Sequence, residues 1–246
     1  VAEAPVPSLS HSPPPPSLAP LASPSQCPSQ PPSSLDSSPL VSTTDSSSPL
    51  KCFDSSFTEL RQSHQQYFFS RNTADQLVRA VLHFFDYDTD RIQREFCCLC
   101  APSIAEIFYH EHSLSVPLLD IDTRFSYLPS FIPFDLLSPP SLFPSPSSPS
   151  SPFSLILFDP PYFDIPLSTM RAAVDSLSSP STRHLVGFLR RDEAQLLRAF
   201  PYLSKTTTQL EYGRVRESRW TNYGLYSDCD LVGVKRIHDK RVKTTK

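Results

Sequence analysis

Residues 153–162 read Phe-Ser-Leu-Ile-Leu-Phe-Asp-Pro-Pro-Tyr. The first six form an apolar run that is typical of a buried strand. An acid, two prolines and a tyrosine follow directly, so they stand at the carboxyl end of the predicted strand. In a parallel sheet with helices on both faces, ligands bind in the crevice beyond these strand ends. We therefore predict that the tetrapeptide Asp159-Pro160-Pro161-Tyr162 forms a catalytic corner.

The chemistry of this corner suits methyl transfer to a nitrogen atom. The Asp159 carboxylate can accept a hydrogen bond from an amine, and the prolines hold the turn stiff because their rings fix φ. The carbonyl of Pro160 can face the incoming amino group, while Tyr162 can stack on a planar base or lie against a cation. The alternative is a Pro-Pro turn that merely ends the strand, and the tetrapeptide alone does not separate the two.

Strands and helices alternate around the corner. The spacing of apolar residues predicts a helix over 71–85, capped by Ser70 or Asn72, and a helix over 104–109 capped by Ser103. Two more helices are predicted over 166–177 and 191–200. The predicted strands are 96–100, 116–119, 131–134, 153–158 and 184–189, then closing strands at 207–212 and 231–234 with a loop over 213–228 between them. This order implies an α/β fold with an open, mostly parallel sheet and a closing hairpin.

The scarcity of glycine excludes two classes of nucleotide site. The chain has 4 glycines, and the first of them is Gly187. A dinucleotide-binding turn and a P-loop both need glycines early in the sheet, so neither can be present. The turn after the first predicted strand is Ala101-Pro102-Ser103, which can approach a small cofactor but forms no cradle for a diphosphate.

Composition divides the chain into a folded part and low-complexity parts. Residues 1–55 are dominated by Pro and Ser and lack the residues that build a core, so we expect a disordered arm there. A second tract of this kind spans 138–152, within a folded domain expected over 56–237, and a basic tail follows at 238–246. The run Pro13–Pro16 leaves open a non-catalytic adaptor that binds SH3 or WW domains.

The charge and the cysteine content exclude further kinds of partner and site. The net charge of −3 and pI near 6.2 give no general attraction to nucleic acid or membrane, and no apolar run approaches the roughly 20 residues of a membrane span. The N-terminus lacks the features of a signal peptide, so we expect a cytoplasmic protein. We also expect it to be a monomer. The Cys97-Cys98-x-Cys100 run has no second pair at metal spacing, which favours buried structural thiols over a metal site.

Four motifs follow one another along the chain: Gln66-Tyr67-Phe68-Phe69-Ser70-x-x-Thr73-Ala74, Ala101-Pro102-Ser103, Asp120-Ile121-Asp122-x-Arg124-Phe125 and the Asp159–Tyr162 corner. In this order they resemble the family of probable N6-adenine methyltransferases. This family includes a lysine methyltransferase of translation elongation factor 1-alpha and a zinc-finger ribosomal-RNA adenine methyltransferase. The resemblance covers about residues 62–234 outside the Pro/Ser insert and implies a class I, Rossmann-like fold that binds S-adenosyl-L-methionine.

The resemblance also assigns residues to the cofactor. It places Phe69, Ser70 and Thr73 in the segment that closes over the methionine end of the cofactor. The glycine-poor first loop of the family corresponds to Ala101, Pro102 and Ser103. Asp120 is then the residue expected to bind the ribose hydroxyls, with Asp122 as its rival, and Asp135 borders the adenine. Two alternatives stay open: Ser103 acts only as a helix cap, and Asp122 only pairs with Arg124.

The methyl acceptor is a lysine or an adenine. A lysine must lose a proton before it attacks, whereas an adenine amino group is neutral but must be unpaired and stacked. The Ser70–Ala74 and Ala101–Ser103 segments look closer to the elongation-factor enzymes, and the 118–122 strand looks closer to the ribosomal-RNA enzyme. We favour a lysine of elongation factor 1-alpha, with an adenine of RNA or DNA as the alternative. Residues 216–223 match the family pattern only loosely.

Overall fold

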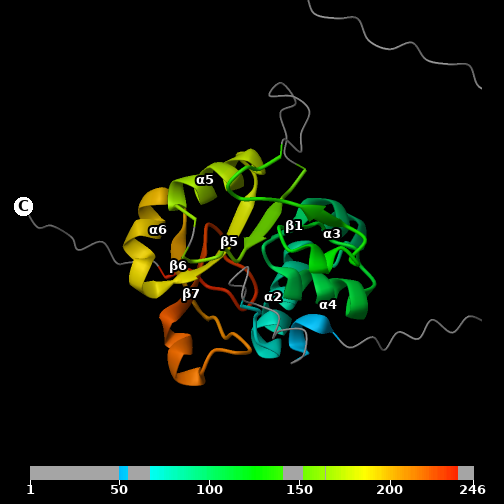
Figure 1. The fold of residues 1–246 in the computed structure, drawn as a ribbon, viewed down its shortest axis with the longest axis horizontal. Coiled ribbons are helices and arrows are strands. Elements are labelled where there is room, and N and C mark those ends of the chain that lie inside the picture. Colours follow the sequence, from blue (N-terminus) through cyan, green and yellow to red (C-terminus); the bar gives the residue numbers. More distant parts are fainter. Residues whose placement is uncertain (1–49, 55–66, 141–151, 164, 238–246) are drawn as a thin grey trace, which may run out of the picture. The chain divides into compact units, whose positions relative to one another are not determined.

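The structure is a computed structural model that describes residues 50–54, 67–140, 152–163 and 165–237. It contains a seven-stranded sheet in the order β3-β2-β1-β4-β5-β7-β6 (Figure 1). Strands β1 to β5 run parallel, and β7 is antiparallel to both of its neighbours. The strands are β1 Phe96–Leu99, β2 Leu118–Asp120, β3 Phe131–Pro133, β4 Leu155–Phe158, β5 Arg183–Leu189, β6 Ser204–Gln209 and β7 Tyr223–Ser227. This topology confirms the class I methyltransferase fold.

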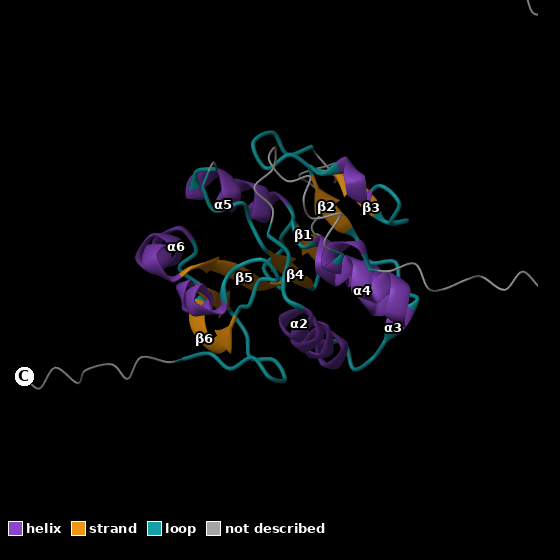
Figure 2. Ribbon diagram, turned by 60° about the horizontal axis from the view of Figure 1, so that its bottom comes forward, coloured by secondary structure: helices purple, strands orange, loops and turns teal. Residues whose placement is uncertain are grey.

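Helices cover both faces of the sheet. Figure 2 shows α5 and α6 on one face and α2 to α4 on the other. The α-helices are α2 Arg71–Phe84, α3 Thr89–Glu95, α4 Pro102–His112, α5 Leu167–Ser176 and α6 Glu193–Ala199. Four short 3-10 turns are η1 Lys51–Phe53, η2 Thr123–Phe125, η3 Arg190–Asp192 and η4 Glu217–Asn222. None of the described helices has the length and apolar character that crossing a bilayer requires.

Alternate residues of each central strand point to opposite faces of the sheet and belong to two hydrophobic cores. In β4, Leu155 and Leu157 pack with α2 and α4, while Ile156 and Phe158 pack with α5 and α6. All four are buried, as expected for a parallel strand covered on both faces. The register aligns Leu99 with both Leu119 and Phe158. Because the strands are parallel, the residues that follow β1, β2 and β4 meet at one edge of the sheet.

The start of α4 differs from the prediction. The helix begins at Pro102 with Ala101 as its N-cap, and Ser103 lies inside the first turn. Proline is favoured at this position because its fixed φ suits a helix and its missing N–H would be unpaired there anyway. Cys100, just before it, has a left-handed φ of 54°. The N-cap predicted for α2 is confirmed, since the Ser70 hydroxyl accepts from the backbone N–H of Thr73.

The second strand of the closing hairpin differs from the predicted one. The pairing strand is β7 at Tyr223–Ser227, within the segment predicted as a loop, and Leu231 and Val234 form only an isolated bridge. The sequence of β7 is Tyr-Gly-Leu-Tyr-Ser, in which Gly224 and Ser227 break up the large side chains, so it lacks an apolar run. Gly224 leaves room for the Arg190 side chain, which packs 3.4 Å from the position of a Cβ there. Helix α3 was missed because it buries only Ile92 and so has no apolar period.

The folded unit begins earlier than composition indicated. Leu50–Asp54, assigned to the Pro/Ser arm, packs on α4 through η1. The backbone N–H groups of Lys51 and Cys52 donate to the buried Glu106 carboxylate at 2.7 and 2.8 Å. We call residues 50–54 the N-terminal strap. The arm at 1–49, most of the 138–152 insert and the tail at 238–246 lie outside the described residues.

Candidate active site

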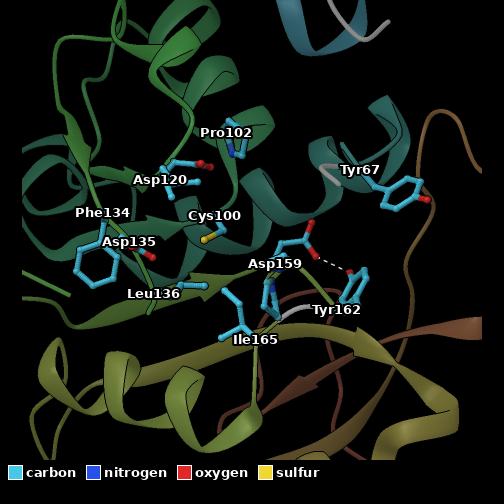
Figure 3. Close-up of a pocket in the computed structure, with 13 residues that line it drawn as sticks. Tyr67, Cys100, Pro102, Asp120, Phe134, Asp135, Leu136, Asp159, Tyr162 and Ile165 are labelled. Carbon is cyan, nitrogen blue, oxygen red and sulfur yellow. Dashed lines mark hydrogen bonds between the residues drawn. The ribbon is translucent and has the colours of Figure 1, made fainter. Parts of the chain in front are cut away.

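A cavity of about 580 Å³, part of it open to solvent, lies at the carboxyl edge of the sheet (Figure 3). Figure 3 shows Asp120 and Phe134 toward one end and Tyr67 and Tyr162 toward the other, with Asp159 and Cys100 between them. We call these the nucleoside end and the acceptor end. The lining residues are Tyr67, Cys100, Pro102, Asp120, Ile121, Phe134, Asp135, Leu136, Asp159, Pro160, Pro161, Tyr162 and Ile165. All four residues of the predicted corner therefore line the cavity.

Asp159 is held in place by its backbone and by two tyrosines. Its N–H donates to the carbonyl of Leu99 at 3.1 Å, which fixes the turn to the end of β1. Its Oδ1 accepts a hydrogen bond of 2.7 Å from the hydroxyl of Tyr162 and another of 2.7 Å from that of Tyr212. The two hydroxyls also contact each other. A carboxylate restrained in this way has one orientation toward the cavity.

The environment of Asp159 changes its acidity. Burial raises the pKa of this carboxyl to about 7, opposed by the hydrogen bonds from Tyr162 and Tyr212 and aided by the charge of Asp120. Burial, and after it the charge of Asp159, also holds the pKa of both tyrosine hydroxyls well above the usual range. The hydroxyls thus remain donors at neutral pH, while Asp159 can bind or release a proton.

Aromatic rings surround the acceptor end. Tyr223 lies 4.7 Å from Tyr212 and 5.8 Å from Tyr162 between ring centroids, and Tyr67 meets Tyr212 edge to face at 6.4 Å. We call Tyr67, Tyr162, Tyr212 and Tyr223 the tyrosine cluster. Rings gathered beside a carboxylate favour a cation, because their faces are electron-rich. The cluster is therefore suited to hold an ammonium group.

The nucleoside end combines an acid with apolar walls. Asp120 is buried at the end of β2, and its Oδ1 accepts from the N–H of Asp122 at 2.9 Å. Asp122 points elsewhere: it accepts from Arg124 Nε at 2.8 Å and caps η2, and it does not line the cavity. Leu136 and the half-exposed Ile121 form apolar walls next to Asp120 and Asp135. Of the two rival acids, Asp120 is the one that faces the cavity.

Five other predicted residues stand behind the lining. Phe69 is buried and pairs with Tyr212 in an isolated bridge, while Ser70 donates to the Glu211 carboxylate at 3.0 Å. The Thr73 hydroxyl accepts from the backbone N–H of Glu211 at 3.0 Å. These three contacts fix Glu211 and Tyr212 in place. Ala101 and Ser103 are buried beside Pro102, which lines the cavity without them.

The lining favours a cofactor that carries a positive charge. Three carboxyl groups, those of Asp120, Asp135 and Asp159, face the cavity, and Pro102 offers no N–H at the start of α4. Phosphate groups would meet repulsion from these carboxylates, and the first turn of α4 has one N–H fewer with which to bind an anion. A nucleoside that carries a positive charge fits the same lining. Apolar walls suit its base, and an acid beside them can accept from ribose hydroxyls.

Several site residues were not identified from the sequence. Tyr67 lies in the first family motif but had no assigned role, and Tyr212 was predicted only as the end of a closing strand. The contact between Tyr212 and Asp159 joins residues 53 positions apart, and no local pattern signals it. Three other lining residues follow the ends of strands, namely Cys100, Ile121 and Leu136. They could have been predicted, because ligands bind beyond the carboxyl ends of parallel strands.

Comparison with known proteins places the chain among methyltransferases. The model of a family described as "Probable N6-adenine methyltransferase" matches residues 61–228. A search of curated proteins found no match. Similar solved structures include TrmN from Thermus thermophilus, at 19% identity over 65% of this chain, with a TM-score of 0.39. This chain spans 48% of the TrmN structure.

Two other similar structures are matched over most of their length. The N-methyltransferase NodS from Bradyrhizobium japonicum WM9 is 14% identical over 68% of this chain and 96% of its own, with a TM-score of 0.40. The aminoglycoside resistance methyltransferase NpmB1 is 12% identical over 62% of this chain and 92% of its own, with a TM-score of 0.41.

Proposed function

Because the chain belongs to the family of probable N6-adenine methyltransferases, and is thus an S-adenosylmethionine-dependent methyltransferase, we propose that it methylates a lysine amine of a protein. The proposed protein is translation elongation factor 1-alpha, the substrate to which the sequence resemblance points. The observation that carries the proposal is the acceptor end of the cavity, where Asp159 lies within the tyrosine cluster. Each of its properties matches a requirement of lysine.

The first requirement is removal of a proton. A lysine ammonium has an ordinary pKa of about 10.4 and must be deprotonated before it attacks. An Asp with an ordinary pKa near 4 is a weak acceptor, whereas the pKa of Asp159 is raised to about 7 by burial. A carboxyl group of this kind can take the proton and release it to solvent at neutral pH. An adenine amino group is already neutral and makes no such demand.

The second requirement is a place for a cation. Lysine enters as an ammonium ion and leaves as a methylammonium ion, so both substrate and product carry positive charge. Aromatic faces bind such ions with about 0.5–2 kcal/mol, depending on solvent exposure. Tyr67 and Tyr223 are partly exposed, and the hydroxyls of Tyr162 and Tyr212 contact Asp159. The cluster thus extends from the surface to the carboxylate.

The nucleoside end holds the cofactor. When bound, S-adenosylmethionine supplies an electrophilic methyl group. We propose that Asp120 accepts hydrogen bonds from the ribose hydroxyls, that Ile121 and Leu136 flank the adenine, and that Asp135 accepts from its amino group. Pro102 and Cys100 line the passage between the two ends, with Ala101 and Ser103 supporting Pro102. Asp122 braces η2 through Arg124.

The three residues predicted at the methionine end receive an indirect role. We propose that Phe69, Ser70 and Thr73 fix the segment that presents Tyr67, because they tie it to Tyr212 and Glu211. Pro160 and Pro161 shape the turn so that its carbonyls border the acceptor end. A lysine that reaches Asp159 is then positioned for attack, and positioning is the main task of a methyltransferase site.

An adenine acceptor is the second candidate, because the description of the matching family names it. Tyr162 could stack on a base as well as on a cation. The raised pKa of Asp159 favours the lysine, which must lose a proton before attack, whereas the adenine amino group is already neutral. The experiment is incubation with radiolabelled S-adenosylmethionine and cell extract, with and without nuclease. Label in a protein band of the size of the elongation factor supports lysine, and label lost with nuclease contradicts it.

A further inference from the structure

Two short turns lie next to the tyrosine cluster. Arg190 in η3 donates from Nε to the carbonyl of Tyr223 at 2.8 Å. Trp220 in η4 donates from Nε1 to the carbonyl of Tyr212 at 3.2 Å. The two turns also contact each other, and η4 is the orange turn at the bottom of Figure 1. Both turns are therefore fixed to the acceptor end of the cavity.

Three exposed arginines lie in or next to these turns, and we call them the acceptor rim: Arg191 in η3, Arg219 in η4 and Arg216, the N-cap of η4. The Arg191 side chain is 68% exposed, and its guanidinium lies 5.6 Å from the ring centroid of Phe163, the residue after the catalytic corner. Arg219 donates its N–H to the carbonyl of Arg216 in a 3-10 turn. Residues three apart in such a turn share a face, so these two cations lie together.

The rim acts on the site electrostatically. Burial raises the pKa of Tyr223, and the charges of Arg219 and Arg191 oppose that rise. Arg191 also forms an ion pair with Asp192 at the surface, with 3.1 Å between Nε and Oδ2, and this pair weakens its effect on the site. Within the described residues, Arg216 and Arg219 enter no ion pair. The rim is thus a positive surface on one side of the acceptor end, whose interior carries a carboxylate and electron-rich rings.

The positive charge of this segment contrasts with the net charge of the whole chain. The protein carries a net charge of −3, whereas residues 214–220 contain three arginines and one glutamate. A nucleic acid would need a basic surface that follows its phosphates over many contacts. A cluster limited to one side of an opening instead matches a few acidic side chains on a folded protein or peptide.

We propose that the acceptor rim binds acidic side chains that flank the target lysine, and so selects lysines in acidic surroundings. This inference rests on the proposed function, because it assumes a lysine at the acceptor end. The rim attracts the acidic neighbours of the lysine while the tyrosine cluster and Asp159 receive its ammonium group. Local repulsion would reject lysines in basic segments, which are common in nucleic-acid-binding proteins.

The experiment measures binding separately from methyl transfer. Fluorescent peptides with one central lysine and acidic, neutral or basic flanks are titrated with the protein and S-adenosylhomocysteine, and the same peptides are assayed for methylation. The variant is Arg191→Glu/Arg219→Glu. Its matched control is Arg183→Glu, an exposed arginine at the opposite end of β5, roughly 20 Å from the rim. Cofactor affinity and thermal unfolding show whether each variant is folded.

We expect acidic peptides to bind roughly ten-fold more tightly than neutral ones at low salt, and the preference to shrink with added salt. The rim variant should lose or reverse the preference, and Arg183→Glu should keep it. Equal binding of acidic and neutral peptides overturns the rim proposal even if lysine is methylated. Acidic peptides that bind but are never methylated support the rim and contradict the lysine acceptor. If a single-stranded RNA of equal charge binds more tightly than the acidic peptide, and the rim variant abolishes RNA binding, the rim is a binding surface for RNA and the proposal is wrong.

Discussion

The carboxylate of Asp159 occupies the space that a side chain on Gly187 would need. A Cβ at Gly187 would lie 2.8 Å from Asp159 Oδ1 and 3.4 Å from the Tyr212 hydroxyl. Gly187 is in β5, next to the end of β4, and its φ is not in the left-handed region. The glycine is needed here for close approach and not for backbone freedom.

Gly187→Ala is therefore expected to displace Asp159 and to lower kcat by roughly 100-fold, the effect of moving a reacting group by about 1 Å. The matched control is Gly213→Ala, where the nearest atoms to a new Cβ are 4.0 Å away. Steady-state kinetics on a methylated substrate measures the effect. Unchanged kcat in Gly187→Ala, with kcat also unchanged in the control, would show that the position of Asp159 is unimportant.

Asp159→Asn should abolish methyl transfer while cofactor binding remains close to that of the wild type. Asn keeps an oxygen that can accept from Tyr162 and Tyr212 but cannot take a proton. Isothermal titration with S-adenosylhomocysteine and a transfer assay separate the two properties. Full activity in Asp159→Asn or Asp159→Ala would remove the corner from the mechanism.

The pH dependence follows from the pKa of about 7 at Asp159. Activity should rise with pH through about 7 as the carboxyl group loses its proton. Stability should change in the other direction. Because the folded-state pKa lies above the ordinary value near 4, the folded protein binds the extra proton, and stability falls as pH rises from about 4 to 7, by roughly 1.4 kcal/mol for each pH unit in that window. Urea unfolding of wild type and Asp159→Asn at several pH values tests this, since the variant should lack this part of the pH dependence.

The tyrosine cluster predicts different results for ring and hydroxyl removal. Tyr223→Phe keeps the ring and should retain activity on lysine, whereas Tyr223→Leu removes it and should lower kcat/KM by roughly ten-fold. The hydroxyls that hold Asp159 belong to Tyr162 and Tyr212, so this pair of variants isolates the ring of Tyr223. Equal losses in both variants would argue against binding of the cation by the ring.

Glu106 should matter for stability and not for chemistry. Its buried carboxylate accepts from Lys51 N, Cys52 N and the Tyr127 hydroxyl, so removal leaves buried donors unpaired. Glu106→Ala is expected to cost about 2–4 kcal/mol of unfolding free energy. The control is Glu111→Gln, which removes an exposed pair with Arg71 and should cost under about 1 kcal/mol. Chemical denaturation compares the two, and a Glu106→Ala protein as stable as the control would contradict a structural strap.

Local signals predicted the parts of the fold that local chemistry determines. The apolar run of β4 and the acid that follows it placed Asp159 at the correct edge, and residue type limited the cap of α2 to Ser70 or Asn72, of which Ser70 is the cap. β7 was missed because its pairing with β5 depends on packing around Gly224 and Arg190, which no run of residues displays. The contacts of Glu106 with Cys52 and of Asp159 with Tyr212 span 54 and 53 positions. Such contacts arise from tertiary packing, which overrides local preference.

Strand order also sets the time at which this enzyme can become active during its synthesis. β6 pairs with the sheet only through β7, which the ribosome makes after it. Until β7 inserts beside β5, β6 has no neighbouring strand in the sheet, and Tyr223 is not yet packed against Tyr212. Non-local pairing of this kind is slow to form. A nascent chain can therefore assemble the nucleoside end well before the acceptor end, and it cannot methylate a partner until nearly all of the domain has left the ribosome.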